Sequence, residues 1–218
     1  MSNDIVWHEL YDRLDTGVCP ICSLIVTRTE SFMNSILYEG VNDQSVRDLI
    51  CNAEGLCNAH AYQLLAHGDP LGHAIIYSDV LNRIIEKMDI TREPVKANRE
   101  KCFFCQSVEH SESAYVKSFA EGLTDEAFRT RYSENGILCV HHYRTVLGKI
   151  KDASIQDFLK QTAIRKYRGL VNSLNEIKRK NDYRNSDEAW TMDEKNAWKK
   201  VVAIINGYQG MKEGLKRG

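Results

Sequence analysis

Six cysteines and two histidines form a motif that occurs twice in this chain and that could hold metal ions. Each copy is a CxxC pair followed by a CxxH pair, and the two copies comprise Cys19, Cys22, Cys57 and His60, and Cys102, Cys105, Cys139 and His142. The pairs are separated by 34 residues in the first copy and by 33 in the second. Three thiolates and one imidazole are a ligand set for a tetrahedral metal ion. The spacing therefore predicts two Cys3His metal sites, each assembled from the four ligands of one copy.

The residues between the pairs also repeat, which indicates an internal duplication. Residues 40–47 align without a gap with residues 122–129, and glycine, aspartate and arginine recur in register with a period near 82 residues. We therefore divide the chain into a first half at residues 1–90, a linker and second half at residues 91–180, and a C-terminal segment at residues 181–218.

The duplication distinguishes the ligands from the neighbouring cysteine and histidine residues. Cys51 aligns with Ser133, so we expect Cys51 to be a small buried residue and not a fifth ligand. His60 aligns with His142, which assigns the ligand role to His142. His141 is then expected to lie behind the ligands or to face solvent.

The elements that must position these ligands are helices. Only three prolines occur, and apolar residues recur at helical spacing, so we expect an all-α fold, a duplicated helical bundle with its metal sites at helix N-termini. At the start of a helix, free backbone N–H groups stabilise thiolates. Asn42 and Thr124 are expected to be the N-caps of short helices at 43–51 and 125–132, and Pro70 the first residue of a long helix.

The C-terminal segment has no counterpart in the duplication. Thr191 and Glu194 form a capping-box pattern at the start of a helix with an apolar face. We expect this segment to pack across the two halves and to cover a metal site, because it carries the large apolar side chains Tyr183, Trp190 and Trp198. A helix that binds a partner protein is the alternative.

The composition is that of an ordinary globular protein, with 43% hydrophobic and 27% charged residues. The net charge of -1 does not favour a nucleic-acid partner. No basic segment followed by an apolar run occurs at the N-terminus, and no stretch approaches the length of a membrane span, so we expect a cytoplasmic protein. A reducing compartment favours metal ligation over disulfide formation.

The motifs resemble those of an uncharacterised prokaryotic family with a domain of unknown function. The resemblance rests on Cys19-Pro-Ile-Cys22, Gly55-Leu-Cys-Asn-Ala-His60, Cys102-Phe-Phe-Cys105, Cys139-Val-His-His142, the closing Asn181-Asp-Tyr-Arg184 and Trp198. It covers nearly the whole chain. It supports the role of these residues as metal ligands and implies no particular activity.

The identity of the metal separates two classes of function. A Cys3His set is typical of structural zinc, which predicts two zinc ions in a scaffold or interaction module with a protein partner. The alternative is two [4Fe-4S] clusters for electron transfer or cluster delivery, because the apolar Phe103 and Phe104 could exclude water from a cluster. Other metals and thiol redox chemistry are weaker alternatives.

The sequence argues against an enzyme without excluding one. It contains no Walker A loop, dinucleotide-binding glycine motif, His-Glu-x-x-His or Gly-x-Ser-x-Gly motif. Four protein ligands leave no open coordination position for a substrate. Dissociation of His60 or His142 would open such a position.

Overall fold

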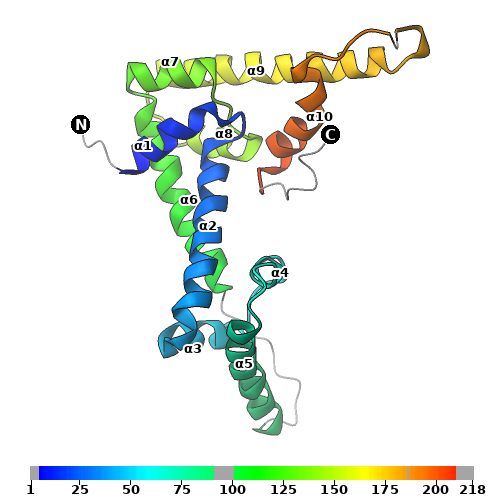
Figure 1. The fold of residues 1–218 in the computed structure, drawn as a ribbon. Coiled ribbons are helices and arrows are strands. Elements are labelled where there is room, and N and C mark those ends of the chain that lie inside the picture. The colour runs from blue at the N-terminus through cyan, green and yellow to red at the C-terminus, as the bar shows by residue number, and fades with distance from the viewer. Residues whose placement is uncertain (1–4, 91–100, 186, 210–218) are drawn as a thin grey trace. The chain divides into compact units, whose positions relative to one another are not determined.

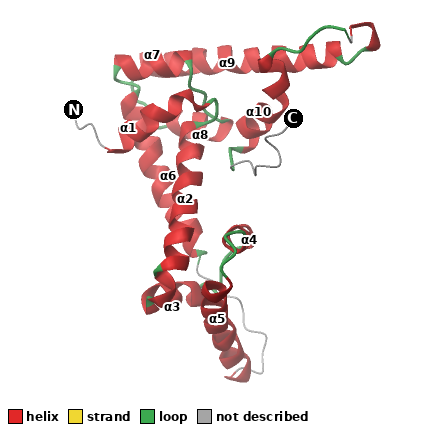
Figure 2. Cartoon of the chain, in the orientation of Figure 1, coloured by secondary structure: helices red, strands yellow, loops and turns green. Residues whose placement is uncertain are grey.

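The computed structural model describes residues 5–90, 101–185 and 187–209, and every regular element in these ranges is helical (Figures 1 and 2). The all-α prediction is confirmed. Residues 91–100, which belong to the expected linker between the halves, lie outside the described ranges. The elements are α1 (Ile5–Asp12), η1 (Arg13–Thr16), α2 (Pro20–Tyr38), η2 (Gly40–Asn42), α3 (Gln44–Asn52), α4 (Asn58–Leu65), α5 (Pro70–Ile90), α6 (Phe103–Gly122), α7 (Glu126–Glu134), α8 (Val140–Leu147), α9 (Ala153–Lys180), η3 (Tyr183–Asn185) and α10 (Met192–Asn206).

The two short helices α3 and α7 begin one residue later than expected, at Gln44 and Glu126. The N-caps are Asp43 and Asp125, and their carboxylates accept hydrogen bonds from the backbone N–H groups of Ser45 at 2.8 Å and Phe128 at 2.9 Å. The predicted caps Asn42 and Thr124 are wrong. An aspartate directly after each of them offers a stronger, charged acceptor to the helix start.

The duplication appears as the same order of helices in each half. Helices α2 to α5 in the first half are followed by α6 to α9 in the second, and α3 and α7 each have nine residues. An equivalent contact recurs in both copies: Nη1 of Arg47 donates to the carbonyl of Val41 at 2.5 Å, and Nη1 of Arg129 donates to that of Leu123 at 2.9 Å. The two arginines thus fix the same turn in each half.

The chain forms two compact units that do not coincide with its two sequence halves. Unit 1 comprises residues 1–26 and 112–218, and unit 2 comprises residues 27–111. Helices α2 and α6 each begin in one unit and end in the other. Each unit therefore contains residues of both halves.

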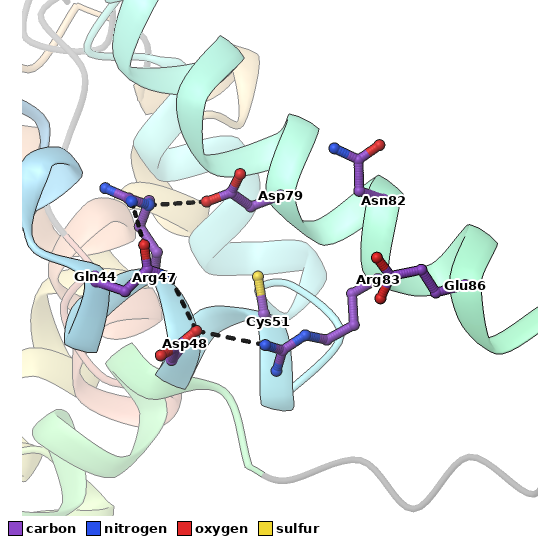
Figure 3. Close-up of a pocket in the computed structure, with 8 residues that line it drawn as sticks. All are labelled: Gln44, Arg47, Asp48, Cys51, Asp79, Asn82, Arg83 and Glu86. Carbon is purple, nitrogen blue, oxygen red and sulfur yellow. Dashed lines mark hydrogen bonds and ion pairs between the residues drawn. The ribbon is translucent and has the colours of Figure 1, made fainter.

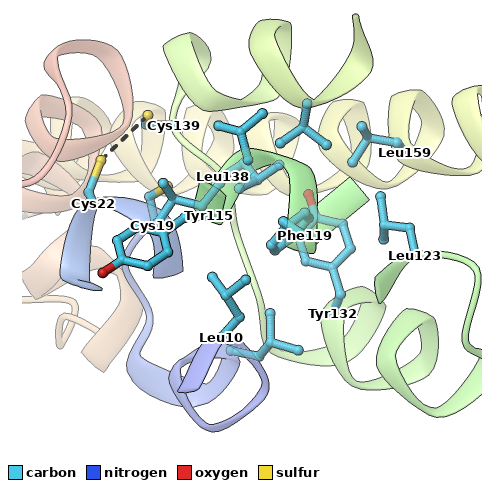
Figure 4. Close-up of a cluster of buried hydrophobic side chains, with 14 of the residues drawn as sticks. Leu10, Cys19, Cys22, Tyr115, Phe119, Leu123, Tyr132, Leu138, Cys139 and Leu159 are labelled. Atoms are coloured by element: carbon cyan, nitrogen blue, oxygen red, sulfur yellow. Dashed lines mark hydrogen bonds between the residues drawn. The ribbon is translucent and has the colours of Figure 1, made fainter. Parts of the chain in front are cut away.

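Each unit has its own apolar core. In unit 1 the buried ring of Phe119 meets the rings of Phe128 and Tyr132 edge to face, with centroids 5.2 and 5.4 Å apart, among leucines of several helices (Figure 4). In unit 2 the fully buried Phe104 packs against Phe32, with ring centroids 5.4 Å apart. Three cysteines of the motifs belong to each core cluster or pack against it.

The C-terminal helix α10 packs within unit 1 against α8 and α9. Its expected capping box is confirmed, and Glu194 also forms a buried ion pair with Lys180 of α9, with Nζ 2.9 Å from Oε2. The expected role of the large aromatic residues is wrong, because Trp198 is 51% exposed and Tyr183 is 85% exposed. The side chains that α10 buries are smaller, among them Ala197 and Ile204.

No helix in the described part of the chain combines the length and the apolar character that crossing a membrane would require.

Candidate metal centres

Four ligand atoms meet in the core of unit 1, in the group that we call site 1: Cys19, Cys22, Cys139 and His142. All four atoms lie within 4.8 Å of one another, and all four residues are buried. Nδ1 of His142 lies 3.4, 3.2 and 3.2 Å from Sγ of Cys19, Cys22 and Cys139, respectively. Sγ of Cys22 lies 3.7 Å from Sγ of Cys139 (Figure 4). One metal ion could bind all four atoms.

A second group with the same composition lies in unit 2, and we call it site 2: Cys57, His60, Cys102 and Cys105. Nδ1 of His60 lies 3.2, 3.7 and 3.4 Å from Sγ of Cys57, Cys102 and Cys105, respectively. Sγ of Cys57 lies 3.7 Å from Sγ of Cys105. Of the four residues only Cys102 is buried, and the other three are partly exposed.

The structure corrects the predicted grouping of the ligands. All eight predicted residues fall in the two groups, but each group joins the CxxC pair of one half to the CxxH pair of the other. The physical reason is the path of the chain. Helix α2 begins at the first CxxC pair in unit 1 and continues into unit 2, so the chain reaches Cys57 and His60 only in the other unit. Helix α6 makes the reverse passage after Cys102.

The prediction that the ligands lie at helix N-termini is confirmed. Cys57 and Cys139 are the N-cap residues of α4 and α8 and have extended backbone angles. Sγ of Cys139 accepts a hydrogen bond from the backbone N–H of His142 at 3.4 Å. Cys19 and Cys102 directly precede α2 and α6. The unpaired N–H groups and the positive end of each helix favour the thiolate form that binds metals.

Glu112 supports the histidine of site 1 and is not among the residues that the sequence singles out. Oε1 of Glu112 lies 2.9 Å from Nε2 of His142 and 2.8 Å from Nε2 of His141. A carboxylate behind a ligating imidazole fixes the tautomer of the ring and raises its basicity. His141 is exposed, which agrees with its exclusion from the ligands. No local pattern around Glu112 signals this role, because its partner lies 30 residues further along the chain.

The ionisable groups of site 1 shift one another's pKa values. Hydrogen bonds from Cys19 and Cys22 lower the pKa of Cys139 far below its usual value, whereas burial raises the pKa of Cys19. Burial opposes the charged form of His142, but hydrogen bonds with Cys139 and Cys22 raise its pKa to about 10. These hydrogen bonds favour the thiolate form of Cys139, which is the form that binds metals, and a divalent cation would compete with protons for these ligands.

Site 2 shows the same division between its cysteines. Burial opposes ionisation of Cys102, but the neighbouring His60 and backbone N–H groups lower its pKa to about 6. Burial and the sulfur of Cys57 raise the pKa of Cys105 to about 12. The lowered pKa of Cys102 favours its thiolate form, which is the form that binds a metal ion.

The seventh cysteine, Cys51, is not part of either group. It is buried in the core of unit 2, as expected, and burial raises the pKa of its thiol. Beside it lies a polar pocket of about 240 Å³ between α3 and α5 (Figure 3). The arginines in this pocket are engaged, since Arg47 bonds Asp79 at 2.8 Å and Arg83 bonds Asp48 at 3.4 Å. The polar side chains of the pocket are therefore explained by ion pairs that join α3 to α5.

The chain has a relative that matches it over nearly its whole length. A protein of Caldicellulosiruptor sp. (strain Rt8B.4), described as an uncharacterized 23.9 kDa protein in the xynA 3' region, is 35% identical over 195 residues, which cover 88% of this chain and 96% of that protein. No solved structure matches the chain. The "Family of unknown function (DUF6062)" matches twice, at residues 1–97 and 89–212, in agreement with the duplication. The chain therefore belongs to the family of unknown function DUF6062.

Proposed function

We propose that this protein is a zinc-binding helical scaffold, with one structural zinc ion in each of its two sites. The observation that carries the proposal is the spacing of the ligand atoms. A tetrahedral zinc ion with Zn–S bonds of about 2.3 Å and Zn–N bonds of about 2.0 Å separates two sulfurs by about 3.8 Å and a sulfur from a nitrogen by about 3.5 Å. The corresponding separations are 3.2–3.7 Å between sulfur and nitrogen and 3.7 Å for one sulfur pair in each site, Cys22 with Cys139 and Cys57 with Cys105. All ligand atoms of a site lie within 4.8 Å of one another.

The same spacing disfavours a [4Fe-4S] cluster. In such a cluster each ligand binds a different iron atom at a corner, so the four ligand atoms stand further apart than those around one ion. Here all four atoms of each site lie within 4.8 Å of one another. A histidine in each ligand set also departs from the usual four cysteines.

The ligands of each site come from two helices that lie far apart in the chain, which supports a structural role for the ions. In site 1 the ligands come from the starts of α2 and α8, and Cys19 lies 123 residues from His142. Closing a loop of this length costs conformational entropy that metal binding can offset. Because all four positions are filled by protein atoms, the ions would hold the helices together without offering a site to a substrate.

Scaffold proteins act through the surfaces that they hold in place, and we infer that the partner is another protein in the cytosol. Helix α10 carries the exposed apolar side chains of Trp198, Val202 and Ile205 at helical spacing. The net charge of -1 gives nucleic acids little electrostatic attraction. A reducing compartment would keep the thiols available for zinc.

Metal analysis of the protein purified without oxygen tests the proposal. We expect two equivalents of zinc per chain, a colourless solution, and X-ray absorption that shows three sulfur ligands and one nitrogen ligand around each ion. Iron and acid-labile sulfide in a brown protein would establish the cluster alternative. Negligible metal together with intact cysteine disulfides would refute both.

A further inference from the structure

The two sites have the same ligands but different surroundings. Site 1 is closed from solvent, with Cys19 at 1%, Cys139 at 0% and His142 at 3% exposure. In site 2 the residues Cys57, His60 and Cys105 are partly exposed. Water and competing ligands can therefore approach site 2 directly, whereas they reach site 1 only after the surrounding structure opens.

The groups behind the ligands differ as well. Glu112 holds Nε2 of His142, but within the described residues nothing bonds Nε2 of His60, whose ring instead packs beside Phe104. Site 1 is also covered by the end of the C-terminal segment, because a β-carbon at Gly207 would lie 3.7 Å from Sγ of Cys22 and Tyr208 packs on the same cluster. Loss of a group behind a ligand typically weakens metal binding by roughly 10- to 100-fold.

The helices that present the two histidines are held differently. Helix α8 packs against α9 and α10, and it buries Val146 as well as His142. Helix α4 buries only Leu64 fully, whereas Tyr62 is 66% exposed and Leu65 is 55% exposed. Few apolar contacts hold α4, so its two metal ligands at its N-terminus account for much of its attachment.

We propose that site 2 is an exchangeable zinc site whose occupancy controls the docking of α4, while site 1 retains its ion permanently. This inference rests on the proposed zinc function. When the ion leaves site 2, Cys57 and His60 no longer bind the same atom as Cys102 and Cys105, and α4 is left with little to hold it. The chain then has a rigid unit 1 and a helix in unit 2 whose order depends on zinc supply.

Zinc release from the full chain tests this difference. Protein loaded with two zinc ions is mixed with a chromophoric chelator, and the release is followed by absorbance. We expect two phases of one equivalent each, with rates that differ by at least roughly 10-fold. Hydrogen exchange at the half-released stage should rise in residues 58–65 and stay low in residues 140–147.

A matched pair of variants assigns the phases. Cys57 and Cys139 both occupy the N-cap position of a helix, where serine is a favoured residue, although only the side chain of Cys139 makes a capping hydrogen bond. Cys57→Ser should abolish the fast phase, and Cys139→Ser should abolish the slow phase. Cys51→Ser, which changes a buried cysteine outside both sites, should leave both phases intact.

The outcomes separate this inference from the function on which it rests. A protein without zinc refutes the proposed function. Two zinc ions that leave at one rate, or a fast phase that disappears with Cys139→Ser, overturn the inference and leave the zinc scaffold intact. If Cys139→Ser does not fold, alkylation of the unaltered zinc protein decides the matter. Modification of Cys57 and Cys105 before Cys19 and Cys22 supports the inference, and the reverse order overturns it.

Discussion

Oε1 of Glu112 lies 2.9 Å from Nε2 of His142, whose Nδ1 faces the three sulfurs of site 1. The carboxylate would thus act on a bound metal ion through the imidazole and not by direct contact. It comes from α6, the helix that begins at site 2 and ends in unit 1. One helix therefore supplies a ligand to one site and the supporting carboxylate to the other.

We expect Glu112→Gln to weaken zinc binding at site 1 by roughly 10-fold, because the amide keeps a hydrogen bond but loses the charge that raises the basicity of His142. Competition with a chelator of known affinity measures the change. Glu121→Gln on the same helix is the control, since Glu121 is exposed and pairs only with Lys117 among the described ion pairs. Equal affinity in the Glu112 variant and in the unaltered protein would contradict the supporting role.

Pairs of substitutions distinguish the observed grouping of ligands from the grouping by sequence halves. Replacing Cys22 and Cys139 together with serine removes two ligands from site 1 alone, so the protein should keep one zinc ion. Replacing Cys22 and Cys57 together damages both sites, so the protein should lose both ions. Elemental analysis measures the zinc content. The opposite pattern would restore the grouping by halves.

The ion pair between Lys180 and Glu194 makes the docking of α10 dependent on pH. The hydrogen bond from Lys180 lowers the pKa of Glu194 below its usual value of 4.5. The resulting stabilisation is complete above that unfolded-state value and is lost as the pH falls through the lower value of the folded state. Glu194→Gln should therefore reduce the melting temperature at pH 7, and the difference from the unaltered protein should shrink in acid.

Exposed Glu188 provides the control for this pH dependence. It pairs with Arg179 at the surface, where ion pairs contribute little, so Glu188→Gln should change the melting temperature only slightly. If the difference in melting temperature between Glu194→Gln and the unaltered protein stays constant from pH 7 into acid, the ion pair is not the source of that difference.

Truncation after Lys180 should affect the two metal sites unequally. It removes α10 and Gly207, which lies beside Cys22, so zinc should leave site 1 faster, while release from site 2 should not change. The melting temperature should fall because α9 and α8 lose their packing partner. Chelator kinetics on the truncated chain measure both rates. Unchanged release from site 1 would mean that the C-terminal segment does not protect it.

The sequence by itself determined the features that depend on near neighbours in the chain. The helical spacing of apolar residues, the capping box at Thr191 and Glu194, and the first position of Pro70 in α5 are local properties, and the structure confirms them. Residue type and spacing also selected the eight residues that the structure brings together in two groups and excluded Cys51, because the duplication shows which cysteines recur. The exact N-caps were wrong by one residue, since Asp43 and Asp125 compete with their neighbours for the same N–H groups.

Only the tertiary structure decided which ligands share a site. Both groupings give two Cys3His sets, so spacing cannot distinguish them. The CxxC pair of each half meets the CxxH pair of the other half because α2 and α6 each begin in one unit and end in the other. The support of His142 by Glu112 and the exposure of Trp198 are decided in the same way. The physical reason is that they depend on contacts between residues distant in the chain. Two nearly identical motifs therefore acquire different surroundings when the chain folds.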